Sequence, residues 1–151
     1  MSTADLPRKR MGAGVLFFDA DDRVLLVEPT HQDHWEIPGG QVEADESPYE
    51  AVMREIAEEL GLSVVPGRLL VVDWVPPEGD HPDGVMFVYD GGLLTANGIQ
   101  LPPDRLRDWS WCDPIETAKR LSPPTARRVS AARRVHGENV TVYLEDGTLV
   151  A

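Results

Sequence analysis

Residues 40–62 read Gly-Gln-Val-Glu-Ala-Asp-Glu-Ser-Pro-Tyr-Glu-Ala-Val-Met-Arg-Glu-Ile-Ala-Glu-Glu-Leu-Gly-Leu. The second part of this stretch predicts a helix over residues 47–60. Ser47 is a good N-cap, and Glu50 follows it at the spacing of a capping box. Gly61 comes directly after the last helical residue, where glycine commonly ends a helix. Both ends of the helix can therefore be assigned from the sequence.

An acidic patch on this helix is unexpected if the helix serves stability alone. At ~100° per residue, Glu55, Glu58 and Glu59 lie on one side of the axis. The opposite arc is apolar and carries Tyr49, Val52, Met53, Ile56 and Leu60. Like charges one turn apart destabilise a helix by ~0.2–0.5 kcal/mol per pair. A divalent cation would reverse this cost, because Mg²⁺ and Mn²⁺ prefer carboxylate oxygens. A solvated charged surface is the alternative interpretation.

The same stretch resembles the signature of the Nudix hydrolases. That signature is Gly, five residues, Glu, seven residues, Arg-Glu, an aliphatic residue, any residue, Glu-Glu, any residue, Gly and an aliphatic residue. The specified positions are all matched, by Gly40, Glu46, Arg54, Glu55, Ile56, Glu58, Glu59, Gly61 and Leu62. The Trp-Glu-Ile-Pro-Gly-Gly of residues 35–40 is also similar to what precedes the motif in this family. The motif covers about one sixth of the chain.

The resemblance implies an α/β/α sandwich with a mixed β-sheet. We expect one domain over residues 1–151, with residues 1–10 as a flexible terminus. The implied reaction is Mg²⁺-dependent, or alternatively Mn²⁺-dependent, hydrolysis of the diphosphate linkage in a nucleoside diphosphate joined to another group. A nucleoside triphosphate, ADP-ribose and a nucleotide sugar all stay open as substrates. Because some proteins of this fold lack activity, the alternative is a non-catalytic nucleotide-sensing or scaffolding module.

The resemblance also assigns roles to individual residues. Glu55 and Glu59 would be the principal metal ligands, and Glu58 a further ligand or the general base. The backbone carbonyl of Gly40 would add a ligand, and Arg54 would orient the carboxylates. The remaining matched positions would be structural, with Glu46 holding the loop against the helix and Gly61 and Leu62 ending it.

Residues Arg10, Trp35, Gly39 and Gly40 are predicted to bind substrate. Arg10 ends a basic run, so it can reach a phosphate or belong to a solvated terminus. Trp35 precedes the Pro-Gly-Gly turn, so it can stack on a base or pack in the core. The Pro- and Gly-rich loop with Asp80, His81 and Asp83 is expected to be a surface loop, with a lid or extra metal ligand as the alternative.

Composition narrows the classes of partner. The formal net charge is −12, and residues 11–112 hold 20 of the 26 acidic residues but only 5 of the 14 Lys and Arg residues. Such an acidic body argues against binding to long nucleic acids, whereas a small nucleotide can bind through a cation.

No apolar run reaches the ~18–20 residues of a membrane span. The single Cys112 excludes an intrachain disulfide and fits a cytoplasmic location. We expect a monomer or homodimer.

Strands and helices are expected to mix along the rest of the chain. Turn residues and apolar patterns predict strands over 11–18, 23–28, 69–75, 85–89, 107–112, 140–144 and 148–150. Helices are predicted over 114–121 and 125–136. The arginines of the last helix, at 127, 128, 133 and 134, are expected to form a solvated outer face.

Overall fold

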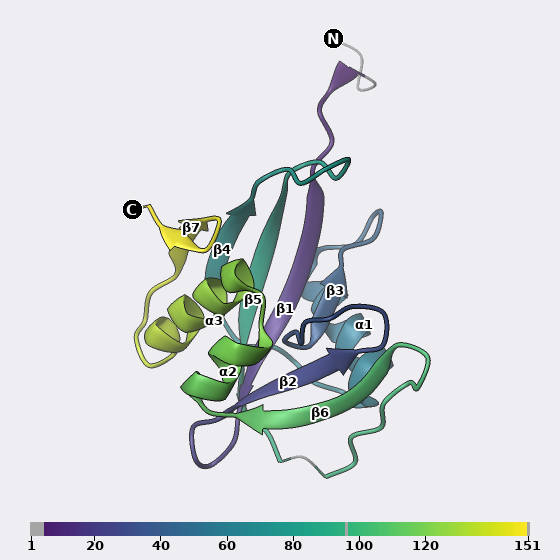
Figure 1. The fold of residues 1–151 in the computed structure, drawn as a ribbon, viewed down its shortest axis with the longest axis vertical. Helices are drawn as coiled ribbons and strands as arrows, with labels where there is room; N and C mark the ends of the chain where they lie inside the picture. The colour runs from purple at the N-terminus through teal and green to yellow at the C-terminus, as the bar shows by residue number, and fades with distance from the viewer. Residues whose placement is uncertain (1–4, 96, 151) are drawn as a thin grey trace.

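The structure is a computed structural model that describes residues 5–95 and 97–150. Figure 1 shows its helices and strands. The strands are β1 (Arg10–Phe18), β2 (Val24–Pro29), β3 (Gly39–Gln41), β4 (Leu69–Val75), β5 (Gly84–Leu93), β6 (Leu106–Cys112), β7 (Val142–Glu145) and β8 (Thr148–Leu149). The helices are α1 (Pro48–Leu60), α2 (Pro114–Arg120) and α3 (Pro123–His136). Within the described residues, the helices are too short or too polar to cross a membrane.

The strands form one mixed sheet. Their order is β6-β2-β1-β5-β4-β7-β8, and β3 pairs with β1 outside this path. Strand β1 runs parallel to β5, and β4 runs parallel to β7. The other neighbouring pairs are antiparallel. The prediction of a mixed sheet is therefore confirmed, with β1 at its centre.

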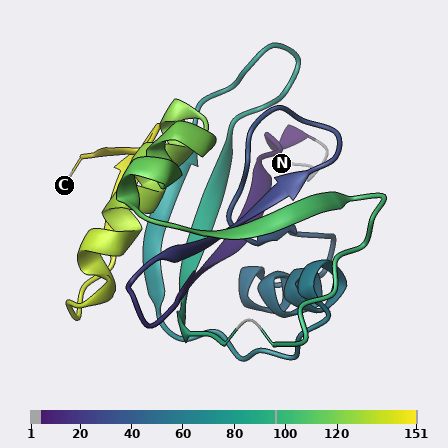
Figure 2. The same cartoon turned by 60° about the horizontal axis from the view of Figure 1, so that its bottom comes forward.

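Helices cover both faces of this sheet. Figure 2 shows α1 on one side, and α2 and α3 on the other. Alternate residues of β1 supply the two cores, because successive side chains of a strand point to opposite faces. Val15 and Phe17 pack with the apolar residues of α1, whereas Leu16 and Phe18 pack with those of α3. The predicted α/β/α sandwich is thus confirmed.

Several predicted boundaries were wrong by a few residues. The helix predicted over 125–136 begins at Pro123, since proline fits the first turn of a helix. The strand predicted over 85–89 continues to Leu93, because it keeps pairing with β1 across a register shift at Leu16 and Phe17. The strand predicted over 140–144 is Val142–Glu145, where the chain pairs with β4.

The start of the chain is tied to the loop before β5. Lys9 forms an ion pair with Asp83 at 2.7 Å, and the backbone N–H of Arg10 donates to the Asp83 carbonyl at 3.1 Å. Residues 1–4, which belong to the expected flexible terminus, lie outside the described residues.

Helix α1 has both predicted caps. The Ser47 side chain accepts a hydrogen bond from the Glu50 backbone N–H at 3.1 Å, and the Glu50 carboxylate accepts one from the Ser47 N–H at 3.0 Å. Gly61 ends the helix in the left-handed conformation with φ 68°. These local bonds fix where the helix begins, and therefore where its carboxylates lie.

We expect Ser47→Ala to lower the free energy of unfolding by ~0.5–2 kcal/mol, because it removes the capping oxygen. Urea unfolding at neutral pH measures this change. Ser63→Ala is the control, since Ser63 is exposed and lies outside the helices and strands. Equal unfolding midpoints for the two variants would show that the cap contributes nothing.

Candidate active site

Two adjacent glycines bring helix α1 close to the central strand. Gly39 and Gly40 pair with Gly14 and Ala13 of β1. Gly39 has φ 149°, and a Cβ there would lie 2.2 Å from the Ala13 carbonyl oxygen. A Cβ on Gly40 would lie 2.5 Å from the Glu55 carboxyl carbon. The missing side chains therefore let a carboxylate of α1 lie directly on β3.

Two of the three predicted metal-ligand glutamates are buried. Glu55 and Glu59 are each 5% exposed, whereas the Glu58 side chain is 44% exposed. This excludes a fully solvated acidic face, which was the alternative interpretation of the helix pattern. Glu55 and Glu59 are buried because α1 makes two contacts. Its apolar arc packs against the sheet, and its flank packs against β3.

Glu59 is a buried carboxylate without a counter-ion. Its Oε1 accepts a hydrogen bond from the Gly39 N–H at 2.7 Å. Within the described residues, its carboxylate forms no ion pair, although Arg105 is near enough for its charge to act on it. Burial raises the pKa of Glu59 to about 8, and the charge of Glu55 adds to this effect. A cation at this position would favour the ionised form.

Arg54 connects the loop before α1 to the acidic face. Its Nε donates to Glu46 at 2.7 Å, and its Nη1 donates to Glu55 at 2.9 Å. Its Nη2 donates to the Gln41 carbonyl oxygen at 3.0 Å. The hydrogen bond from Arg54 lowers the pKa of the Glu46 carboxyl. Through these contacts, Arg54 can orient the Glu55 carboxylate and Glu46 can hold the loop against the helix.

Arg105 is a site residue that the sequence did not reveal. It lies just before β6, and its guanidinium spans Glu55 at 2.9 Å and Glu58 at 3.0 Å. The hydrogen bond to Glu55 raises the pKa of Arg105. Thr30 holds this segment by donating to the Arg105 and Asp104 carbonyl oxygens. Because these contacts join residues about 50 positions apart in the chain, no local pattern marks them.

The glutamates do not converge as a metal cage. Among the described residues, no group of three or more His, Cys, Asp or Glu side chains is arranged to hold a metal ion. Arg105 bridges Glu55 and Glu58, while Glu59 turns to Gly39. The chemistry of the donors nevertheless suits a divalent cation, since carboxylate oxygens are hard ligands and the buried Glu59 carboxyl has no counter-ion within the described residues.

A cavity of about 500 Å³ opens beside these residues, on the face of the sheet that α3 covers. Arg10, Gly39, Gly40 and Glu59 line it, together with Arg105. The structure therefore brings three of the four predicted substrate-binding residues to one cavity with a predicted metal ligand. Glu55, Glu58 and Arg54 lie outside its lining.

Trp35 does not line the cavity. Its ring packs against the core beneath α3, and the Arg120 guanidinium lies 4.3 Å from the ring centroid. The predicted stacking of Trp35 on a base is not supported by this position. In the loop before β5, Asp83 binds Lys9 and the Trp74 indole N–H, which are structural contacts.

Comparisons with known proteins agree with this architecture. A family model described as the NUDIX domain matches residues 8–132. The uncharacterized Nudix hydrolase YvcI of Bacillus subtilis is 29% identical over 92 residues, which cover 59% of this chain and 58% of YvcI. The YjhB protein of the same organism is 44% identical over 98 residues, which cover 57% of this chain and 47% of YjhB. The chain thus spans about half the length of these two relatives.

A solved structure extends the similarity over most of the fold. A MutT protein from Methanosarcina mazei Go1 superposes with a TM-score of 0.71 at 26% identity, covering 89% of this chain and 99% of that protein. The family model covers far more than half of the sequence, and the fold and the motif agree with it. The chain therefore belongs to the Nudix hydrolase family.

Proposed function

We propose that this protein is a Mg²⁺-dependent, or alternatively Mn²⁺-dependent, hydrolase of the diphosphate linkage in a nucleoside diphosphate joined to another group. The observation that carries the proposal is the buried Glu59 carboxylate, which lacks a counter-ion and lies at the wall of the cavity. Family membership supports the reaction class. A nucleoside triphosphate, ADP-ribose and a nucleotide sugar are the candidate substrates.

Glu55, Glu58, Glu59 and the Gly40 carbonyl would hold the cation. When bound, such a cation neutralises phosphate charge and activates water. Arg54 keeps Glu55 in place through its contacts with Glu46 and Gln41. The half-exposed Glu58 is accessible enough to accept a proton from water, or to act as a further ligand.

Arg10 would contact the substrate at the cavity mouth. Its Nε donates to the Pro82 carbonyl oxygen at 2.8 Å, and the residue lines the cavity. An anionic substrate entering an acidic protein needs such cations on its way. Gly39 and Gly40 would let the phosphates approach the backbone closely.

We expect hydrolysis to require a divalent cation. Activity on a panel of nucleoside triphosphates, ADP-ribose and nucleotide sugars should be lost in EDTA and restored by excess Mg²⁺ or Mn²⁺. Release of phosphate, pyrophosphate and nucleoside monophosphate should be measured separately, because the products identify the bond that is cut. Undiminished turnover in EDTA would refute the mechanism, and no turnover of any substrate would favour the sensing or scaffolding module.

We expect Glu59→Gln to abolish most activity while stabilising the metal-free protein at high pH. The raised pKa of Glu59 means that its contribution to stability is present at low pH and is lost as the pH rises from about 4.5 to about 8. The Gln variant lacks this loss. Melting temperatures without metal should therefore agree at pH 4.5 and favour Glu59→Gln at pH 8.5. A variant that melts lower than wild type at pH 8.5 would show that Glu59 is structural.

We expect Arg105→Ala to tighten Mn²⁺ binding several-fold, because the Arg105 guanidinium occupies the oxygens of Glu55 and Glu58. Arg107→Ala is the matched control, since Arg107 is a nearby arginine whose contacts are with Glu28 and Thr30. Electron paramagnetic resonance of free Mn²⁺ gives both affinities. If Arg105→Ala binds Mn²⁺ no better than Arg107→Ala does, Arg105 does not compete with the cation.

A further inference from the structure

One of the α3 arginines predicted to lie on a solvated face is buried and lines the cavity. Arg128 of α3 is only 7% exposed, and its Nε donates to the fully buried Asp73 of β4 at 2.7 Å. The other oxygen of Asp73 accepts from the Gly147 N–H at 3.0 Å. The prediction that Arg128 belongs to a solvated face was therefore wrong. Because desolvation offsets most of the attraction in a buried ion pair, stability alone does not explain this one.

Most of the donors of Arg128 remain for a ligand. A guanidinium carries five N–H donors, and only the one on Nε makes a hydrogen bond within the described residues. Arg128 borders the cavity, and its Nη atoms are not among the fully buried unpaired atoms of the described residues, so they are accessible to a ligand there. Asp73 fixes the guanidinium plane in advance, so both Nη groups are oriented before a ligand enters.

Glu36 supplies an acceptor in the same cavity. Its Oε1 accepts from Gln32 at 3.1 Å, and its Oε2 accepts no hydrogen bond within the described residues. Burial raises the pKa of Glu36, whereas the Gln32 hydrogen bond and the charge of Arg128 lower it. Glu36 and Arg128 both line this cavity, one as a hydrogen-bond acceptor and the other as a donor.

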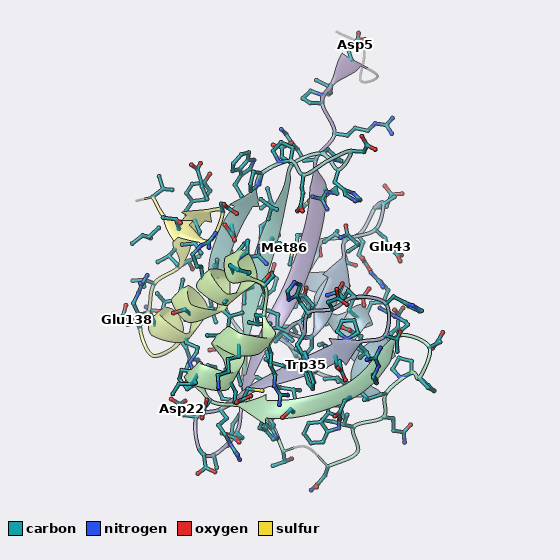
Figure 3. The ribbon with its side chains drawn as sticks, viewed as in Figure 1. Asp5, Asp22, Trp35, Glu43, Met86 and Glu138 are labelled. Atoms are coloured by element: carbon teal, nitrogen blue, oxygen red, sulfur yellow. The ribbon has the colours of Figure 1, made fainter. Side chains whose placement is uncertain are left out.

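The floor of the cavity is apolar. Gly12 and Met86, which line it, are register partners across β1 and β5, and the buried Asp73 of β4 follows outside the lining in the same row. A Cβ on Gly12 would lie 2.3 Å from the Met86 sulfur, so the Met86 side chain lies over Gly12. Figure 3 shows Met86 near the middle of the sheet. Ile37 also lines the cavity. A flat ring suits such a floor better than a phosphate does.

We propose that this part of the cavity binds a nucleobase with a lactam edge, meaning a carbonyl next to a ring N–H, as in guanine and uracil. Arg128 donates to the carbonyl oxygen, and Glu36 accepts from the ring N–H. The inference rests on the proposed function, because the phosphates must then lie near Glu59. Adenine and cytosine present an amino group beside a ring acceptor, which reverses both contacts. A phosphate would satisfy Arg128 but be repelled by Glu36.

The test compares kcat/KM for GTP, UTP, ATP and CTP in Mg²⁺. We expect GTP or UTP to be preferred by ~10- to 100-fold over ATP and CTP. Arg128→Lys should reduce this preference, because a point charge replaces the planar fork. Arg127→Lys is the matched control and should leave it unchanged, since Arg127 binds the Asp146 carbonyl away from the cavity. Comparing GTP with UTP tells which lactam base fits.

Glu36→Gln gives a second test that spares the buried ion pair. It should lower the preference by weakening the contact to the ring N–H, whereas Glu28→Gln, at a residue outside the cavity lining, should not. The inference is overturned if ATP, CTP or ADP-ribose is used as efficiently as GTP and UTP. It is also overturned if Arg128→Lys and Glu36→Gln both keep the full preference.

If no nucleoside triphosphate, ADP-ribose or nucleotide sugar is hydrolysed, the proposed function fails and the base site is judged by binding. Calorimetric titration with GMP, UMP, AMP and CMP then decides. Tighter binding of GMP or UMP than of AMP and CMP supports the base site without the reaction. Equal affinities, or no binding, overturn it.

Discussion

The burial of two carboxylates against a pair of glycines is the constraint on which the site depends. Glu55 lies directly on Gly40, and Glu59 accepts a hydrogen bond from Gly39. Arg54 and Arg105 neutralise Glu55, whereas within the described residues Glu59 accepts a hydrogen bond from a backbone N–H and forms no ion pair. Because an unpaired buried carboxylate is expensive to ionise, the folded protein gains from any cation that binds here.

The central strand links this charge to the cavity. Strand β1 pairs with β3, which carries the two glycines, and with β5, which carries Met86. The acidic side of α1 and the polar groups near α3 are therefore held by neighbouring strands of one sheet. A rigid sheet would fix the spacing between the proposed phosphate end near Glu59 and the proposed base end near Arg128, so such a substrate could be positioned without a large rearrangement. The loop segment that carries Arg105 approaches the glutamates from outside this frame.

The parts of the fold that depend on local sequence could be predicted. The capping box of Ser47 and Glu50 and the stop at Gly61 act within one or two turns, so they set the ends of α1 wherever the helix packs. The burial of Glu55 and Glu59 could not be derived from the helical pattern, because it depends on β3 packing against the flank of α1. Arg105 and Arg128 act on partners about 50 or more residues away, and neither has a local signal. For Trp35, stacking on a base and core packing were both compatible with the sequence, and its packing against the core outside the cavity lining distinguishes them.

Direct measurement of Mn²⁺ binding tests the central claim without relying on any substrate. Free Mn²⁺ is followed by electron paramagnetic resonance as the wild type and Glu59→Gln are titrated at pH 6.5 and pH 8.5. We predict saturable binding to the wild type that is tighter at pH 8.5, because the cation must displace the proton of Glu59. Glu59→Gln should bind at least ~10-fold more weakly and with little dependence on pH. Equal affinities of the two proteins at both pH values would contradict the assignment of this carboxylate to a cation.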